Sequence, residues 1–219
     1  MTDNPLLATE GLPDFEHILP EHVEPAVRAL LTDSERRLAE LEATLAPTWD
    51  AIVPPLDDLG RAYERTWGPV THLFGVRNSD ELRAAYEKVL PDVVSFGLKL
   101  RQSEPIYQAL KALREGSDWA TLNEPQQRII QRKLLSAELA GIGLSAEKRA
   151  RFNEIARELS KLGSDYSNHV LDATKAYELV IRDPADAEGL PLSLRRIAAQ
   201  SYNERKPVDE PEATPESGP

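Results

Sequence analysis

Long stretches of helically spaced apolar residues are the feature that most limits how this chain folds. From Pro20 onward, apolar side chains recur at intervals of three and four residues, which places them along one face of a helix. The β-branched residues never gather into alternating runs, and the helix-favouring residues Ala, Leu, Glu and Arg are abundant. The sequence therefore predicts an all-α fold of several long antiparallel amphipathic helices.

Capping residues and prolines divide this pattern into segments. The second segment contains Pro54, Pro55 and Pro69, which threaten its continuity. Asn123 and Gln126 form a capping-box signature at the start of the fifth. The expected helices cover residues 20–45, 48–70, 79–96, 105–114, 124–139, 145–174 and 193–202.

The turn between the fifth and sixth segments is set by Gly141 and Gly143, because glycine accepts the left-handed conformation that ends a helix. Ser145 then caps the longest helix. Its apolar stripe is expected to lie in the core, and it consists of Phe152, Ile155, Leu159, Leu162, Tyr166, Val170 and Leu171.

Three regions follow from this reading. Residues 1–19 form an irregular N-terminal arm, residues 20–205 a helical domain, and residues 206–219 a disordered tail rich in proline and acid. Residues 178–181 are a short β-prone run within the helical domain.

The charge balance and the lack of cysteine limit the function classes. The chain carries 37 acidic and 26 basic side chains, a formal charge of -11, so its average surface field repels a nucleic-acid backbone. Without cysteine there are no disulfides, thiolate metal sites or thiol nucleophiles. No apolar stretch is long enough to span a bilayer, and the N-terminus lacks a leader pattern. We expect a cytoplasmic protein that binds neither nucleic acid nor membrane.

Two histidines near the N-terminus, His17 and His22, have carboxylates beside them and are the ligand types that zinc prefers. A helical zinc pair requires histidines four residues apart, whereas these are five apart with Pro20 between them. An independent metalloenzyme built on them is therefore disfavoured, and capping and surface roles are expected.

The other candidate residues also favour structural roles. His72 is expected to be a hydrogen-bonded packing residue, and His169 lies near Asp165 and Asp172, which indicates a pH-sensitive contact. No nucleophile accompanies either histidine, and no phosphate-binding glycine motif occurs. Three glutamates on the longest helix lack the histidine that a bundle metal site needs, so they predict a solvated face: Glu147, Glu154 and Glu158. The residues thus predict no catalytic, cofactor-binding or metal-binding site.

The segment from Gly141 to Thr174 nevertheless resembles the corresponding helix of the thimet-type zinc metallo-oligopeptidases of the oligopeptidase A type. Further matches occur in the same order along the chain, at residues 4–7, 18–26, 69–73, 86–91 and 120–123. The resemblance covers residues 4 to about 205 and corresponds to roughly the first third of a full-length family member.

The resemblance implies a mostly helical cytoplasmic peptidase that cuts short peptides inside a deep channel. The family binds zinc through a His-Glu-x-x-His helix and a further glutamate, and the motif glutamate activates the metal-bound water. None of the four histidines here begins that motif, so no family catalytic residue is carried onto this chain.

Two functions remain open at this point. In the first, the chain supplies one wall of the substrate channel, packs against a catalytic portion and is inactive alone. In the second, it is a free-standing helical module that docks onto a peptidase or onto peptides without chemistry. The second function would be indicated by helices with more apolar surface than a single bundle can bury.

Overall fold

The computed structural model describes residues 4–217, which form two compact units that meet within one helix, after Asp165. No strand occurs among the described residues, and the prediction of an all-α fold is confirmed. The expectation of a single helical domain over residues 20–205 stays a prediction.

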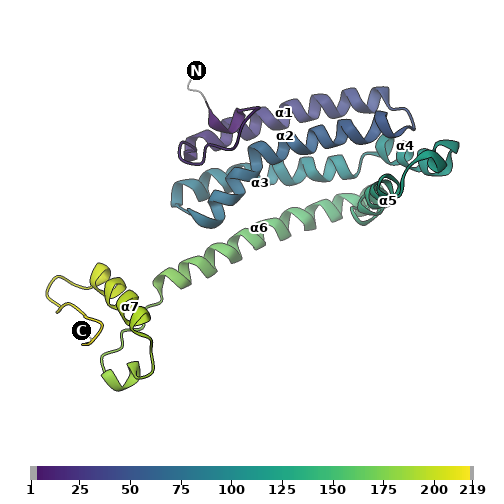
Figure 1. Cartoon of the computed structure of the whole chain (residues 1–219). Helices are drawn as coiled ribbons and strands as arrows, with labels where there is room; N and C mark the ends of the chain where they lie inside the picture. The colour runs from purple at the N-terminus through teal and green to yellow at the C-terminus, as the bar shows by residue number, and fades with distance from the viewer. Residues whose placement is uncertain (1–3, 218–219) are drawn as a thin grey trace. The chain divides into compact units, whose positions relative to one another are not determined.

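The first unit contains most of the helices (Figure 1). Its elements are η1 (Pro5–Leu7), α1 (Pro20–Thr44), α2 (Trp49–Val76), α3 (Asp80–Arg101), α4 (Glu104–Glu115), η2 (Ser117–Thr121), α5 (Glu124–Leu139) and the greater part of α6 (Ala146–Ala176). The second unit contains the end of α6, then η3 (Pro184–Ala187) and α7 (Leu192–Arg205).

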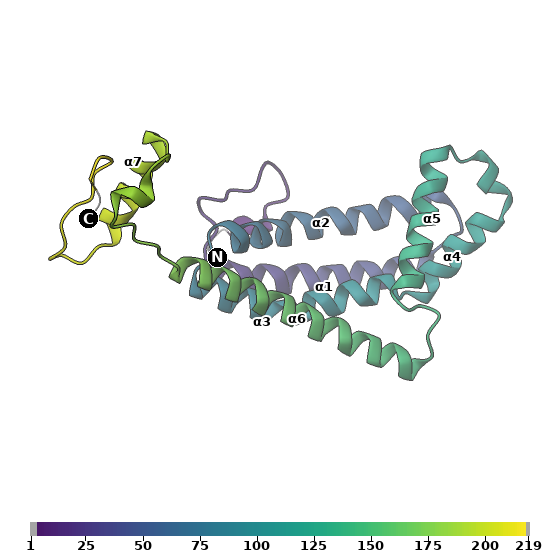
Figure 2. The same cartoon turned by 90° about the horizontal axis from the view of Figure 1, so that it is seen from below.

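Helices α1, α2 and α3 lie side by side, and Figure 2 shows α4 and α5 at the end of this bundle where α1 leads into α2. Two apolar clusters fill the first unit. One joins η1 to the start of α1, the end of α2 and the start of α3, with Trp67 and Phe74 stacked on Tyr86. The other joins the opposite ends of these helices to α4 and α5, and Ile130 is completely buried within it.

Helix α2 runs unbroken from Trp49 to Val76 although it contains Pro54, Pro55 and Pro69. Each internal proline removes a backbone hydrogen bond and costs about 3 kcal/mol in an exposed helix. Helix α2 offsets this cost because it contributes side chains to both apolar clusters, and burial of one large apolar side chain stabilises by about 1.5–3 kcal/mol.

The helix starts follow the capping signals in the sequence. Thr48 and Ser79 accept hydrogen bonds from backbone amides three residues later, at 3.4 and 3.2 Å. At α5 the Asn123 side chain accepts from the Gln126 amide, and the Gln126 side chain accepts from the Asn123 amide, both at 3.0 Å. The predicted capping box is confirmed, and α5 covers the predicted residues.

The described part of the irregular N-terminal arm, residues 4–19, is anchored to the bundle, and residues 1–3 lie outside the described residues. Leu6 and Ile18 are buried in the first apolar cluster. The Thr66 hydroxyl donates to the Leu6 carbonyl at 3.1 Å, and the Asn4 side chain donates to the His22 carbonyl at 2.9 Å. The arm therefore closes one end of the α1–α3 bundle.

The second unit is built around α7. The β-prone run at residues 178–181 forms neither helix nor strand. Residues 206–217 also lack helix and strand, and they contact α7. Their predicted disorder stays a prediction. The Asn203 side chain donates to the Ala213 carbonyl at 3.0 Å and accepts from the Ala213 amide at 2.8 Å. Residues 218 and 219 of the predicted tail lie outside the described residues.

Among the residues that the structure describes, none of the helices has the length and hydropathy of a membrane span.

Candidate functional site

The two N-terminal histidines have separate structural roles. The His17 Nδ1 atom lies 2.8 Å from Asp14 Oδ2, and this hydrogen bond lowers the pKa of the Asp14 carboxyl. The His22 Nδ1 atom accepts a hydrogen bond from the Leu19 amide at 3.1 Å, at the start of α1. The capping and surface roles expected from the sequence are the ones observed.

The other two histidines lie apart from these. His72 is exposed on α2 and contacts the ring of Phe15, with ring centroids 5.3 Å apart, so its partner is an aromatic ring. His169 is exposed on α6. Asp165, one of the acids expected near it, accepts a hydrogen bond from Lys161 Nζ at 2.6 Å. The pH-sensitive contact at His169 stays a prediction.

The three glutamates of α6 are exposed, and Glu154 forms an ion pair with Arg151 at 3.1 Å. Throughout residues 4–217, no group of three His, Asp or Glu side chains is arranged to hold a metal ion. The zinc that the resemblance implies therefore has no matching donor set in the described part of this chain.

The candidate site is instead an apolar surface on α6. Its three members lie in the first unit and are exposed by 41 to 63%, and they are Ile155, Leu159 and Leu162. We call these residues the α6 apolar face. They belong to the stripe predicted to be buried, so that prediction is wrong for them, as it is for the exposed Tyr166 and Val170 of the second unit. The spacing correctly predicts a helix with one apolar face, but spacing alone does not show whether that face is covered.

A second set of side chains explains this orientation. Asn153 and Gln102, the residue that caps the end of α3, exchange two hydrogen bonds, at 2.6 and 3.2 Å, which bind a polar side of α6 to the bundle. Small or polar residues follow Asn153 along the less exposed side of α6, including Ala156 and Ser160. The bundle therefore contacts the polar side of α6 and leaves the apolar side uncovered.

The spacing within the α6 apolar face matches the seam of a helix pair. From Phe152 to Leu162 the apolar residues are separated alternately by three and four positions. This is the repeat of about 3.5 residues at which two helices interlock side chains along their length. The geometry is suited to a partner helix lying along α6.

The turn between α5 and α6 fixes the direction in which α6 leaves the bundle. Gly141 has a φ of 87°, and the amides of Gly141 and Ile142 bond to the carbonyls of Glu138 and Ala137 at 3.0 and 3.1 Å. The predicted left-handed conformation is confirmed at Gly141, whereas Gly143 does not have a positive φ. Arg149 secures the start of α6, because its Nη2 donates to the Ile142 carbonyl at 2.5 Å.

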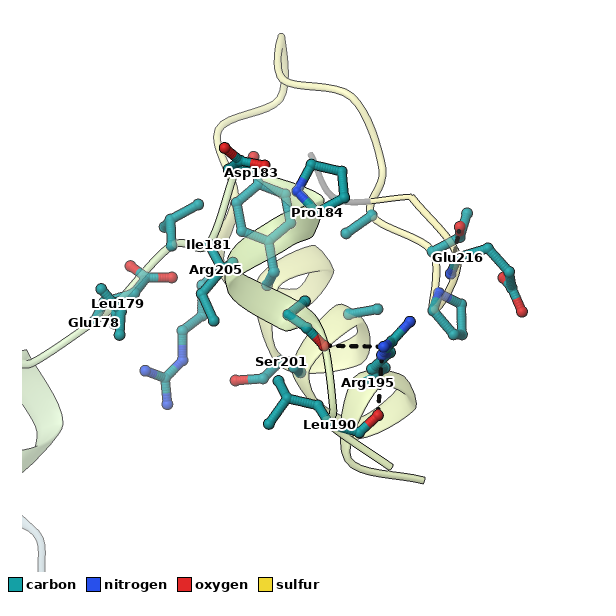
Figure 3. A pocket seen from close by; sticks show the side chains of 18 of the residues that line it. Glu178, Leu179, Ile181, Asp183, Pro184, Leu190, Arg195, Ser201, Arg205 and Glu216 are labelled. Carbon is teal, nitrogen blue, oxygen red and sulfur yellow. Dashed lines mark hydrogen bonds between the residues drawn. The ribbon is translucent and has the colours of Figure 1, made fainter. Parts of the chain in front are cut away.

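The second unit contains a cavity of about 340 Å³. Figure 3 shows the extended run 177–181 on one side of it and α7 beside it, and residues 213–216 line another part. Arg195 of α7 lines this cavity. Its Nε and Nη2 donate to the carbonyls of Leu190 and Ala187 at 3.1 and 2.9 Å (Figure 3), so the guanidinium holds a loop in place. The sequence does not predict this cavity, because its walls come largely from segments without regular periodicity.

The family model of the neurolysin/thimet oligopeptidase N-terminal domain matches residues 27–149. The chain belongs to this family. The resemblance found in the sequence is thereby confirmed.

Relatives extend the match to almost the whole chain. The organellar oligopeptidase A of Arabidopsis thaliana, described as chloroplastic/mitochondrial, is 43% identical over 219 residues, which is 100% of this chain and 27% of the relative. Oligopeptidase A of Escherichia coli is 42% identical over 207 residues, or 94% of this chain and 30% of the relative. The dipeptidyl carboxypeptidase of Salmonella typhimurium is 22% identical over 213 residues, or 94% of this chain and 31% of the relative. The chain thus spans less than one third of the length of these relatives.

Proposed function

We propose that this chain is the N-terminal helical portion of a zinc metallo-oligopeptidase that degrades short peptides in the cytoplasm. In this role it supplies one wall of the substrate channel, and the catalytic portion carries the zinc ligands. Family membership supports the proposal, as do the relatives named oligopeptidase A, one of which is described as a probable cytosolic enzyme.

The exposed α6 apolar face is the observation that carries the proposal. Soluble proteins seldom leave a contiguous row of large apolar side chains in water, and such rows mark interaction surfaces. Leu159 is 63% exposed and Leu162 is 53% exposed, although they occupy positions of an interlocking repeat. We infer that a helix of the catalytic portion covers this row.

The chain's own residues would then have a positioning role without chemistry. The two hydrogen bonds between Asn153 and Gln102 hold α6 against α3, and the left-handed turn at Gly141 directs the helix away from α5. Since the sequence contains no His-Glu-x-x-His motif, we expect the chain alone to hydrolyse no peptide.

The test is reconstitution in two parts. The 219-residue chain is co-expressed with the region of Escherichia coli oligopeptidase A that lies outside its match to this chain. Complex formation is measured by size-exclusion chromatography with light scattering, and activity by hydrolysis of a quenched fluorescent peptide. We expect a complex of one copy of each part, and zinc-dependent hydrolysis that neither part shows alone.

Other outcomes favour the second function. If the 219-residue chain binds the quenched peptide itself but forms no complex with the catalytic region, it is a peptide-binding module. Peptidase activity of the purified chain that substitutions within it abolish would overturn the proposal.

A further inference from the structure

A second uncovered surface lies on α5, in the first unit and away from the α6 apolar face in sequence. Three large apolar side chains of α5 are exposed, namely Ile129 by 40%, Leu135 by 43% and Leu139 by 72%. A shallow depression of about 450 Å³ runs along this helix and is lined by Pro125, Arg128, Ile129, Arg132, Lys133 and Ser136. We call these six lining residues the α5 basic face.

The charge of this face is opposite to that of the whole chain. Arg128 and Arg132 are exposed one helical turn apart, on either side of Ile129 in sequence. Neither guanidinium has a hydrogen bond or ion pair among the described residues, whereas Lys133 pairs with Asp57 of α2 at 3.5 Å. Two unneutralised cations therefore border an exposed apolar residue in a chain whose formal charge is -11.

The composition of the face indicates a protein partner. Arginine combines an apolar stem with a planar cation, and it is enriched where protein interfaces bind most strongly, whereas lysine is depleted there. Nucleic acid fits poorly, because a nucleic-acid backbone presents a long row of phosphates and two arginines neutralise few of them.

We propose that the α5 basic face is a docking site for an acidic amphipathic helix of another polypeptide. Carboxylates one turn apart on that helix pair with Arg128 and Arg132, since a guanidinium binds a carboxylate through two parallel hydrogen bonds. An apolar residue between the carboxylates covers Ile129 in the depression. A partner without carboxylates would leave both guanidinium groups desolvated and unpaired, which disfavours its binding.

This docking is separate from the proposed wall function. It uses α5, and it requires neither a catalytic portion nor a substrate channel. The site therefore remains testable if the reconstitution with the oligopeptidase A region fails.

The test uses the full 219-residue chain and a fluorescein-labelled helical peptide in which Glu residues one turn apart flank Leu residues. A second peptide with Gln in place of each Glu serves as the uncharged probe. We expect saturable binding of the Glu peptide by fluorescence anisotropy, about tenfold tighter than binding of the Gln peptide. Added salt should weaken the binding of the Glu peptide, because both arginines are exposed.

Substitutions on α5 test whether the Glu peptide binds at the α5 basic face. The double substitution Arg128→Glu/Arg132→Glu should weaken binding of the Glu peptide by more than about tenfold, and Arg128→Gln/Arg132→Gln should weaken it by a smaller factor. The matched control is Arg65→Glu/Lys148→Glu, which reverses two exposed cations on α2 and α6 that have no ion pair among the described residues. Circular dichroism confirms that each variant is folded.

Three results would overturn the proposal. They are the absence of saturable binding by the Glu peptide, equal affinity for the Gln peptide, and an equal loss of affinity in the control variant.

Discussion

Substitution of the two leucines of the α6 apolar face, Leu159→Gln together with Leu162→Gln, tests the docking of α6 directly. Glutamine has nearly the same helix propensity as leucine, so α6 itself should persist. Because both side chains are already more than half exposed, the free chain should change in stability by less than about 0.5 kcal/mol.

The magnitude follows from the exposed fractions. Full burial of one leucine side chain stabilises by about 1.5–3 kcal/mol, and these two leucines are 63% and 53% exposed. A helix that covered these exposed parts of Leu159 and Leu162 would therefore stabilise the complex by about 2–3 kcal/mol in total. Loss of that gain corresponds to about 30- to 150-fold weaker association.

The assay is titration of the oligopeptidase A catalytic region with the wild-type or variant chain by isothermal calorimetry. The matched control, Glu154→Gln/Arg157→Gln, changes two exposed polar residues of the same helix outside the apolar face and should leave the affinity within about threefold. An affinity of the leucine variant within that same range would refute the docking argument.

Two further predictions concern the first unit alone. Gly141→Ala should destabilise the chain by about 1–2 kcal/mol in urea denaturation. The alanine would have to adopt the positive φ of Gly141, and its Cβ would lie 2.8 Å from Leu144 Cδ1. Gly143→Ala, which meets no atom within 4 Å, should not destabilise it, and equal losses would contradict this account. Burial raises the pKa of Tyr63 to about 12, so the folded state favours the neutral phenol and loses stability as pH rises above about 10. Tyr63→Phe should lessen the drop in urea midpoint between about pH 9 and about pH 11, and an unchanged drop would contradict the assignment.

Local signals in the sequence predict where several helices begin and end. The Asn123 box and the turn at Gly141 depend on residues close together in the chain, and each forms as predicted. The continuity of α2 was harder to predict, because the cost of Pro54, Pro55 and Pro69 is offset by burial in clusters that join several helices. Such burial is a property of the tertiary structure and leaves no mark at the prolines themselves.

For the candidate site, the sequence predicts the apolar residues but not their exposure. The helical spacing predicts the apolar residues of α6 and places Leu159 and Leu162 in a core, yet both side chains are more than half exposed. The informative residues were Gln102 and Asn153, whose mutual hydrogen bonds hold the polar side of α6 to α3. They are 51 positions apart, so no sequence window contains both.

The α6 apolar face also has a consequence for the colloidal behaviour of the chain. Each molecule carries a formal charge of -11 beside this exposed apolar face, so mutual repulsion keeps the apolar faces of two molecules apart at low ionic strength. Salt screens that repulsion but leaves apolar attraction in place. Solutions of this chain should therefore be most monodisperse in dilute buffer, and its solubility should fall as salt is added.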